Sequence, residues 1–96
     1  MNYNTIKRLQ RDYGYNDVQE MINSGIIWSM EGSMGRQAMS LLESGACMLP
    51  KESHKDYYGN HIPSRDMLKD GTKGTFGNCK SFWQGVEDGS IFIEHE

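Results

Sequence analysis

Apolar residues recur at helical spacing near the start of the chain. Ile6, Leu9 and Tyr13 fall on one face of a segment that Asn4 can cap and that Gly14 ends. A second helix is expected to follow, because Asn16 and Gln19 have the spacing of a capping box, in which a side-chain oxygen and an amide satisfy each other's backbone donors. Its apolar stripe consists of Val18, Met21 and Ile22 and extends toward Ile26.

The pattern leaves two endings open for this second helix. It either ends at Ser24–Gly25 or continues to Met30, because a glycine costs only about 1 kcal/mol inside a helix. In both cases we expect Ile26, Ile27 and Trp28 to contact the core. A third helix is predicted from the cap Ser33 to the stop Gly45, with Met34, Ala38, Leu41 and Leu42 on its apolar face.

The spacing changes after the third helix. The short apolar run Cys47–Leu49 is stopped by Pro50 and suits a strand or an extended entry into a loop. Residues 51–55 are expected to be solvated. Glycine and proline are frequent between residues 56 and 77, which predicts turns with one helical turn after Ser64.

The last part of the chain returns to regular spacing. Asn78 is expected to cap an amphipathic helix that Gly89 ends and whose apolar face holds Cys79, Phe82, Trp83 and Val86. Alternation then predicts a terminal strand over Ser90–Glu94. That strand needs a neighbour for its backbone groups, and Cys47–Leu49, residues 71–76 and a second chain are all open.

Together these elements predict a small, mostly helical α+β protein. We expect about four helices and a short two- or three-stranded antiparallel sheet from the C-terminal half. The length of 96 residues allows one core, so residues 1–96 are expected to form a single domain. Its parts are a helical region (1–45), an irregular loop-rich region (46–77) and a helix with a terminal strand (78–96).

Composition and charge narrow the classes of function. No apolar run approaches the roughly 18 residues of a membrane span, and residues 1–10 lack the apolar stretch of a secretory signal. We therefore expect a cytoplasmic protein with two free thiols and no membrane partner. The formal net charge of -3 does not favour binding to nucleic acid.

A glycine-rich turn, residues 71–77, leads into the predicted last helix. Backbone N–H groups at a helix N-terminus bind anions, so an anion site is a hypothesis here. The candidate donors are Thr72, Lys73, Gly74, Thr75 and Asn78. The alternative is that the glycines only permit tight turns.

The cysteines raise two further hypotheses. Cys79, in the first turn of the last helix, becomes a nucleophile in a thiol enzyme if the helix dipole lowers its pKa and if His54, His61 or His95 serves as the base. Its place on the apolar face favours burial instead. Zinc is disfavoured because Cys47, His54, His61 and Cys79 lack the close ligand pairs of structural sites, and we expect no metal, no cofactor and no catalytic residue.

Two regions are candidate contact surfaces. One is an aromatic loop with Tyr57, Tyr58, Asn60, His61 and Arg65, since tyrosines on a pinned loop give large contact area at low entropic cost. The tyrosines can instead fold back over the core. The other is the exposed edge of the third helix with Arg36 and Gln37.

DNA binding is the alternative for the third helix. A helix-turn-helix would present Arg36, Gln37 and Ser40 to base edges, with a basic face formed by Lys7, Arg8, Arg11 and Arg36. Acidic residues around the third helix oppose contact with phosphate.

The hypothesis we favour is a small non-enzymatic protein that binds another protein. Its seven methionines are adaptable contact residues wherever they lie exposed, and the ones that matter here are Met30, Met34, Met39 and Met48. Small size and isolated motifs suggest an accessory or inhibitor protein of a phage or mobile element. The sequence does not predict the identity of the partner or the oligomeric state.

Overall fold

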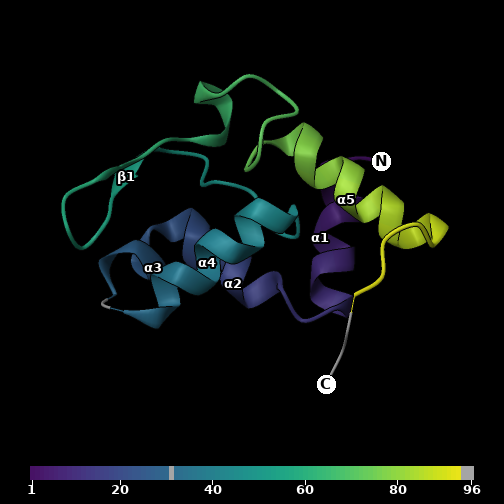
Figure 1. The fold of residues 1–96 in the computed structure, drawn as a ribbon, viewed down its shortest axis with the longest axis horizontal. Coiled ribbons are helices and arrows are strands. Elements are labelled where there is room, and N and C mark those ends of the chain that lie inside the picture. Colours follow the sequence, from purple (N-terminus) through teal and green to yellow (C-terminus); the bar gives the residue numbers. More distant parts are fainter. Residues whose placement is uncertain (31, 94–96) are drawn as a thin grey trace.

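The computed structural model describes residues 1–30 and 32–93 (Figure 1). It confirms the predicted class, a mostly helical α+β fold with a short antiparallel sheet in the C-terminal half. The elements in chain order are α1 (Tyr3–Asp12), α2 (Asn16–Ser24), α3 (Ile26–Ser29), α4 (Ser33–Ser44), β1 (His54–Lys55), β2 (His61–Ile62), the 3-10 turn η1 (Arg65–Met67) and α5 (Phe76–Asp88).

The first two helices begin differently from the predictions. Asn2, not Asn4, caps α1, because its side chain accepts a hydrogen bond from the backbone N–H of Thr5 at 2.9 Å. The predicted capping box in α2 is wrong. Tyr15 occupies the cap position without a side-chain bond, and the side chain of Gln19 is buried instead.

Gly25 settles where the second helix ends. Its φ of +85° is a left-handed conformation that ends α2 at Ser24, and the four-residue α3 follows directly. A Cβ here would lie 2.5 Å from the ring of His54, so the chain also approaches β1 too closely for a larger residue. Ile27 and Trp28 are buried as expected, whereas Ile26 is 52% exposed.

The caps of α4 and α5 are each shifted from the expected residue. Gly32 rather than Ser33 occupies the cap position of α4. Thr75 rather than Asn78 caps α5, because its hydroxyl accepts from the backbone N–H of Asn78. Both helices end at the predicted glycines, Gly45 and Gly89, in left-handed conformations.

The sheet is built from strands that the alternation pattern did not predict. β1 pairs antiparallel with β2, with His54 opposite Ile62 and Lys55 opposite His61. Cys47–Leu49 is irregular and lies outside the sheet. Residues 90–93 are likewise not a strand, because the backbone N–H of Ile91 bonds back to Gly85 of α5; Glu94 lies outside the described residues.

Two apolar clusters form the core, and the segment 46–49 joins them. One cluster lies among α2, α3 and α4, and the other lies between α1 and α5, which are in contact (Figure 1). Alternate residues of the segment serve different clusters: Cys47 and Leu49 pack in the first, and Ala46 and Met48 in the second. The segment is thus the partition shared by both halves of the core.

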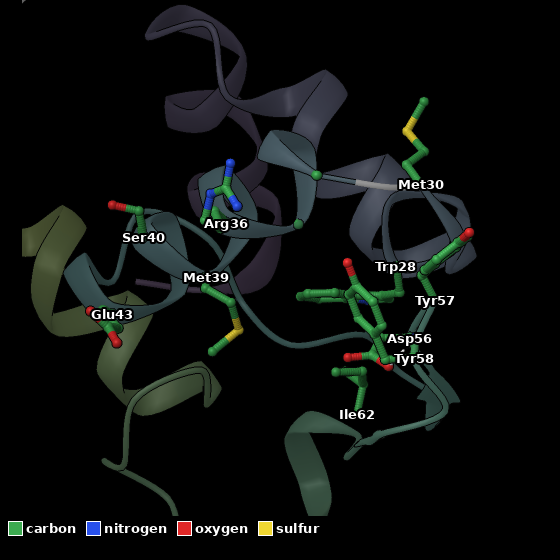
Figure 2. A pocket seen from close by; sticks show the side chains of 12 residues that line it. Trp28, Met30, Arg36, Met39, Ser40, Glu43, Asp56, Tyr57, Tyr58 and Ile62 are labelled. Atoms are coloured by element: carbon green, nitrogen blue, oxygen red, sulfur yellow. Dashed lines mark hydrogen bonds between the residues drawn. The ribbon is translucent and has the colours of Figure 1, made fainter.

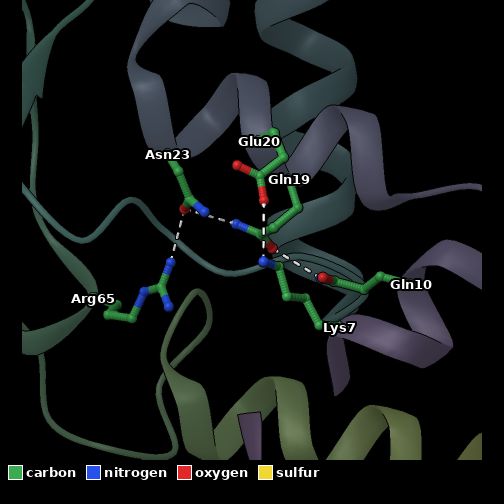
Figure 3. Close-up of polar contacts among 6 residues, drawn as sticks. All are labelled: Lys7, Gln10, Gln19, Glu20, Asn23 and Arg65. Carbon is green, nitrogen blue, oxygen red and sulfur yellow. Dashed lines mark hydrogen bonds and ion pairs between the residues drawn. The ribbon is translucent and has the colours of Figure 1, made fainter. Parts of the chain in front are cut away.

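Side-chain amides replace a neighbouring strand along this partition. Gln19 accepts from the backbone N–H of Met48 at 2.8 Å and donates to the Met48 carbonyl at 3.0 Å. Gln10 donates both to Gln19 and to the Ala46 carbonyl. Figure 3 shows how Asn23 extends this chain of contacts from Gln19 to Arg65. The Ala46 carbonyl and both backbone groups of Met48 therefore find partners without a sheet.

Within the described part of the chain, no helix is both long and apolar enough to cross a membrane.

Candidate protein-interaction groove

A groove of about 490 Å³ lies between α4 and the β1–β2 hairpin, with α3 at one end (Figure 2). It brings together the two regions that the sequence singled out separately. Its lining residues are Trp28, Met30, Gly32, Gly35, Arg36, Met39, Ser40, Glu43, Asp56, Tyr57, Tyr58 and Ile62.

The wall on α4 follows from the helical period. Ala38 and Leu42 face the core and are almost fully buried. Arg36, Met39 and Glu43 therefore fall on the opposite face, at spacings of three, four and seven residues. One side of the groove is thus a regular row of exposed side chains along a rigid element.

The opposite wall is pinned by Asp56. Its carboxylate accepts from the backbone N–H groups of Tyr58 at 2.9 Å and Asn60 at 2.8 Å, and from the Asn60 side chain at 3.2 Å. Desolvation raises the pKa of Asp56, but the hydrogen bonds from Asn60, Tyr58 and Gly59 outweigh it, so the pKa lies below its usual value. Asp56 thus holds the turn that carries the tyrosines.

The aromatic side chains of this turn point away from the core. Tyr57 is 55% exposed and Tyr58 is 73% exposed. The two rings meet edge to face, with centroids 5.1 Å apart. The alternative in which they fold back over the core is therefore wrong.

Two of the four methionines considered as contact residues are exposed at the groove. Met30 and Met39 are exposed and line the groove. Met48 is buried, and Met34 is partly buried against the core. The exposed pair gives the groove flexible apolar surface at its end and on its wall.

Three polar groups of residues that line the groove have no partner among the described residues. Arg36 and Glu43 are exposed and form no ion pair. The indole N–H of Trp28 is buried and makes no hydrogen bond, which is uncommon for a buried donor. A ligand can offer complementary groups to all three.

The remaining predicted contact residues lie around the groove or elsewhere. Gln37 on α4 and Asn60 and His61 on the hairpin are exposed but do not line it. Arg65 is buried and donates to the Leu49 carbonyl and to Asn23, both at 2.8 Å. It is therefore part of the core network and is not available as a contact residue.

Six lining residues were not predicted from the sequence as contact residues: Trp28, Gly32, Gly35, Glu43, Asp56 and Ile62. Glu43 had a usable signal, because it lies seven residues after Arg36 and so on the same helix face. Trp28 was expected in the core, where it does lie, but its second role depends on the hairpin packing nearby.

Several donors and acceptors of the glycine-rich turn bond within the turn itself. The carboxylate of Asp70 accepts from the backbone N–H of Gly77 at 2.9 Å, at the start of α5. Thr75 accepts from the N–H groups of Gly71 and Asn78 and donates to the Thr72 carbonyl. The candidate site formed by Thr72, Lys73, Gly74, Thr75 and Asn78 is thus partly occupied by the turn's own hydrogen bonds. The side-chain amide of Asn78, however, is a buried donor without a partner among the described residues, and the anion site stays a prediction.

Burial decides the character of both thiols. Cys47 and Cys79 are fully buried, and desolvation raises the pKa of each to about 12. The effect expected from the N-terminus of α5 is outweighed, so neither thiol is a thiolate near neutral pH.

The zinc ligands considered above do not converge. Within residues 1–30 and 32–93, no group of three or more metal-ligating side chains is placed to hold an ion. The ring of His54 lies 3.4 Å from the Asn23 carbonyl and His61 is exposed on β2; His95 lies outside the described residues.

The basic face required for DNA binding is divided. Lys7, Arg8 and Arg11 line a separate shallow depression on α1, whereas Arg36 lines the groove. Lys7 also lies 3.8 Å from the carboxylate of Glu20. No single surface gathers the four cations.

No protein-family model, curated protein or solved structure matches this chain. The groove is therefore the feature of the molecule that points to a function.

Proposed function

We propose that this chain is a non-catalytic protein that binds another protein through the groove between α4 and the hairpin. The observation that carries the proposal is the set of exposed apolar side chains around the groove: Met30, Met39, Tyr57 and Tyr58. Uncovered apolar side chains gathered at one concave site are typical of interaction surfaces.

The charges at the groove favour binding over catalysis. Arg36 and Glu43 are seven residues apart on one helix, which separates their backbones by about 10 Å. General acid–base work needs groups within hydrogen-bond reach of the same reacting atoms. These two are better placed to contact separate residues of a partner.

Affinity capture from the cells that make the protein tests the proposal. The change is the double substitution Tyr57→Ala and Tyr58→Ala, and the matched control is Phe92→Ala, since Phe92 is 88% exposed and lies away from the groove. We expect the double variant to lose a protein that the wild type and the control retain. Circular dichroism should show that all three fold alike, because the tyrosines lie outside the core.

Two results would contradict the proposal. One is a double variant that captures the same protein as the wild type. The other is a Phe92→Ala variant that loses it equally, since that would place the contact elsewhere.

A further inference from the structure

We infer that the groove binds an extended segment of the partner protein in which one apolar side chain lies between an acidic and a basic residue. This inference rests on the proposed function and adds the chemistry of the partner. It follows from the size of the groove, the placement of its charges and its unsatisfied donor.

The size of the groove favours a short segment. A segment of only a few residues is too short to form a stable helix in water and is therefore expected to bind in an extended form. The groove offers about 490 Å³, which is typical of a site that encloses a few side chains. Trp28, Met39, Tyr58 and Ile62 surround this space, so its occupant needs an apolar side chain.

The charged side chains on the α4 wall determine which residues of the bound segment flank its apolar residue. Arg36 and Glu43 are about 10 Å apart along α4. In an extended chain alternate residues point to the same side, and positions i and i+4 are about 13 Å apart. Flexible charged side chains bridge the difference, so an acidic residue meets Arg36, an apolar residue enters the groove and a basic residue meets Glu43.

The third charged lining residue does not alter this pattern. Asp56 accepts hydrogen bonds from Tyr58 and Asn60, which hold it within its own turn. Arg36 and Glu43 have no such partners among the described residues. They are therefore the two groups whose charge an occupant can complement.

The indole of Trp28 suggests a main-chain contact. Its N–H is a buried donor without an acceptor in the groove lining, and an extended segment carries unpaired backbone carbonyls along its length. The N–H is buried in the free protein, so such a contact requires neighbouring side chains to shift.

Three short peptides test the inference at low salt, where exposed charges are least screened. The mixed peptide is acetyl-Glu-Gly-Phe-Gly-Lys-amide. The double-acid and double-base peptides carry Glu or Lys at both ends. All three are titrated into the full chain, and binding is followed through the two indole N–H resonances, assigned with a Trp28→Phe variant.

We expect the wild type to bind the mixed peptide about threefold or more tightly than either like-charged peptide. The substitution Glu43→Lys should move the preference to the double-acid peptide, and Arg36→Glu should move it to the double-base peptide. This design needs no assumption about chain direction. The Trp28 resonance should shift on binding while that of Trp83, which donates to the Ala46 carbonyl, stays in place.

Equal affinity for the three peptides, or a preference that the two substitutions leave unchanged, would overturn the inference. So would self-association of the protein that Met39→Glu abolishes, since the occupant would then be a second copy. If the tyrosine variant still loses its cellular partner, the proposed function stands without this inference. If that variant keeps its partner, the proposed function itself fails.

Discussion

Replacing Gln19 by alanine should be the most damaging single change in the polar network of the core. The Gln19 side chain makes four hydrogen bonds: with the N–H and the carbonyl of Met48, with Gln10 and with Asn23. Because Gln19 is 1% exposed and Met48 is fully buried, water does not replace these partners. The substitution therefore leaves a buried backbone donor and a buried acceptor unsatisfied.

The size of the effect follows from these two groups. Each buried group left without a partner costs about 1–3 kcal/mol, and the helix propensity of alanine returns less than about 0.5 kcal/mol. We therefore expect Gln19→Ala to lower the free energy of unfolding by about 3 kcal/mol. Domains of this size are stable by roughly 5–14 kcal/mol, so the midpoint temperature should fall by about 10 °C or more.

Urea unfolding followed by circular dichroism measures this difference. The matched control is Gln37→Ala, because Gln37 is exposed on α4 and its side chain has no hydrogen-bond partner among the described residues. The control should change stability by less than about 0.5 kcal/mol. A loss below about 1 kcal/mol for Gln19→Ala would refute the view that side-chain amides support the partition 46–49.

Two further predictions concern the same core. Burial raises the pKa of Cys47 and Cys79 from 9.0 to about 12 and keeps both thiols neutral in the folded protein. Iodoacetamide at pH 8 should therefore label neither thiol until denaturant is added. Because the thiols ionise more easily in the unfolded chain, their contribution to stability should be complete below pH 9 and be lost as the pH rises toward 12. Rapid labelling of the folded protein would contradict this. Gly74→Ala should lower the free energy of unfolding by about 1–3 kcal/mol more than Gly14→Ala. Both glycines have positive φ, but only at Gly74 would a Cβ lie 2.7 Å from the Leu49 side chain. Equal losses of stability for the two variants in thermal melts would contradict this prediction.

Helix content was predictable because it depends on local signals. The stripe with Ala38 and Leu42 and the stop at Gly45 define α4 without knowledge of the rest of the chain. The exact caps were less certain because several residues near each start can accept a backbone hydrogen bond. Asn2 does so instead of Asn4, and Thr75 instead of Asn78.

The strands were not predictable because a strand needs a partner as well as a pattern. Ile91 and Ile93 alternate with Phe92, yet residues 90–93 pair with no other strand. Polar His54 and Lys55 form β1 because the Asp56 turn brings β2 alongside them. Register and pairing are tertiary properties that alternation alone does not contain.

Part of the groove lining could be predicted from the sequence. The sequence predicts Tyr57, Tyr58 and Arg36 as contact residues, and the structure places them on two walls of one groove. Their convergence depends on how the hairpin packs against α3. The prediction of Arg65 as a contact residue is wrong for the same reason, because its burial depends on hydrogen bonds to Asn23 and Leu49, which are distant in the sequence.

Photo-crosslinking inside the cells that make the protein tests the groove most directly. The crosslinking amino acid p-benzoylphenylalanine replaces Tyr58 in one variant and Ser81, which is exposed on α5 and outside the groove, in the other. We expect the variant at position 58 to form a covalent adduct with a specific protein and the variant at position 81 to form none. Adducts only from position 81, or the same adducts from both positions, would contradict it.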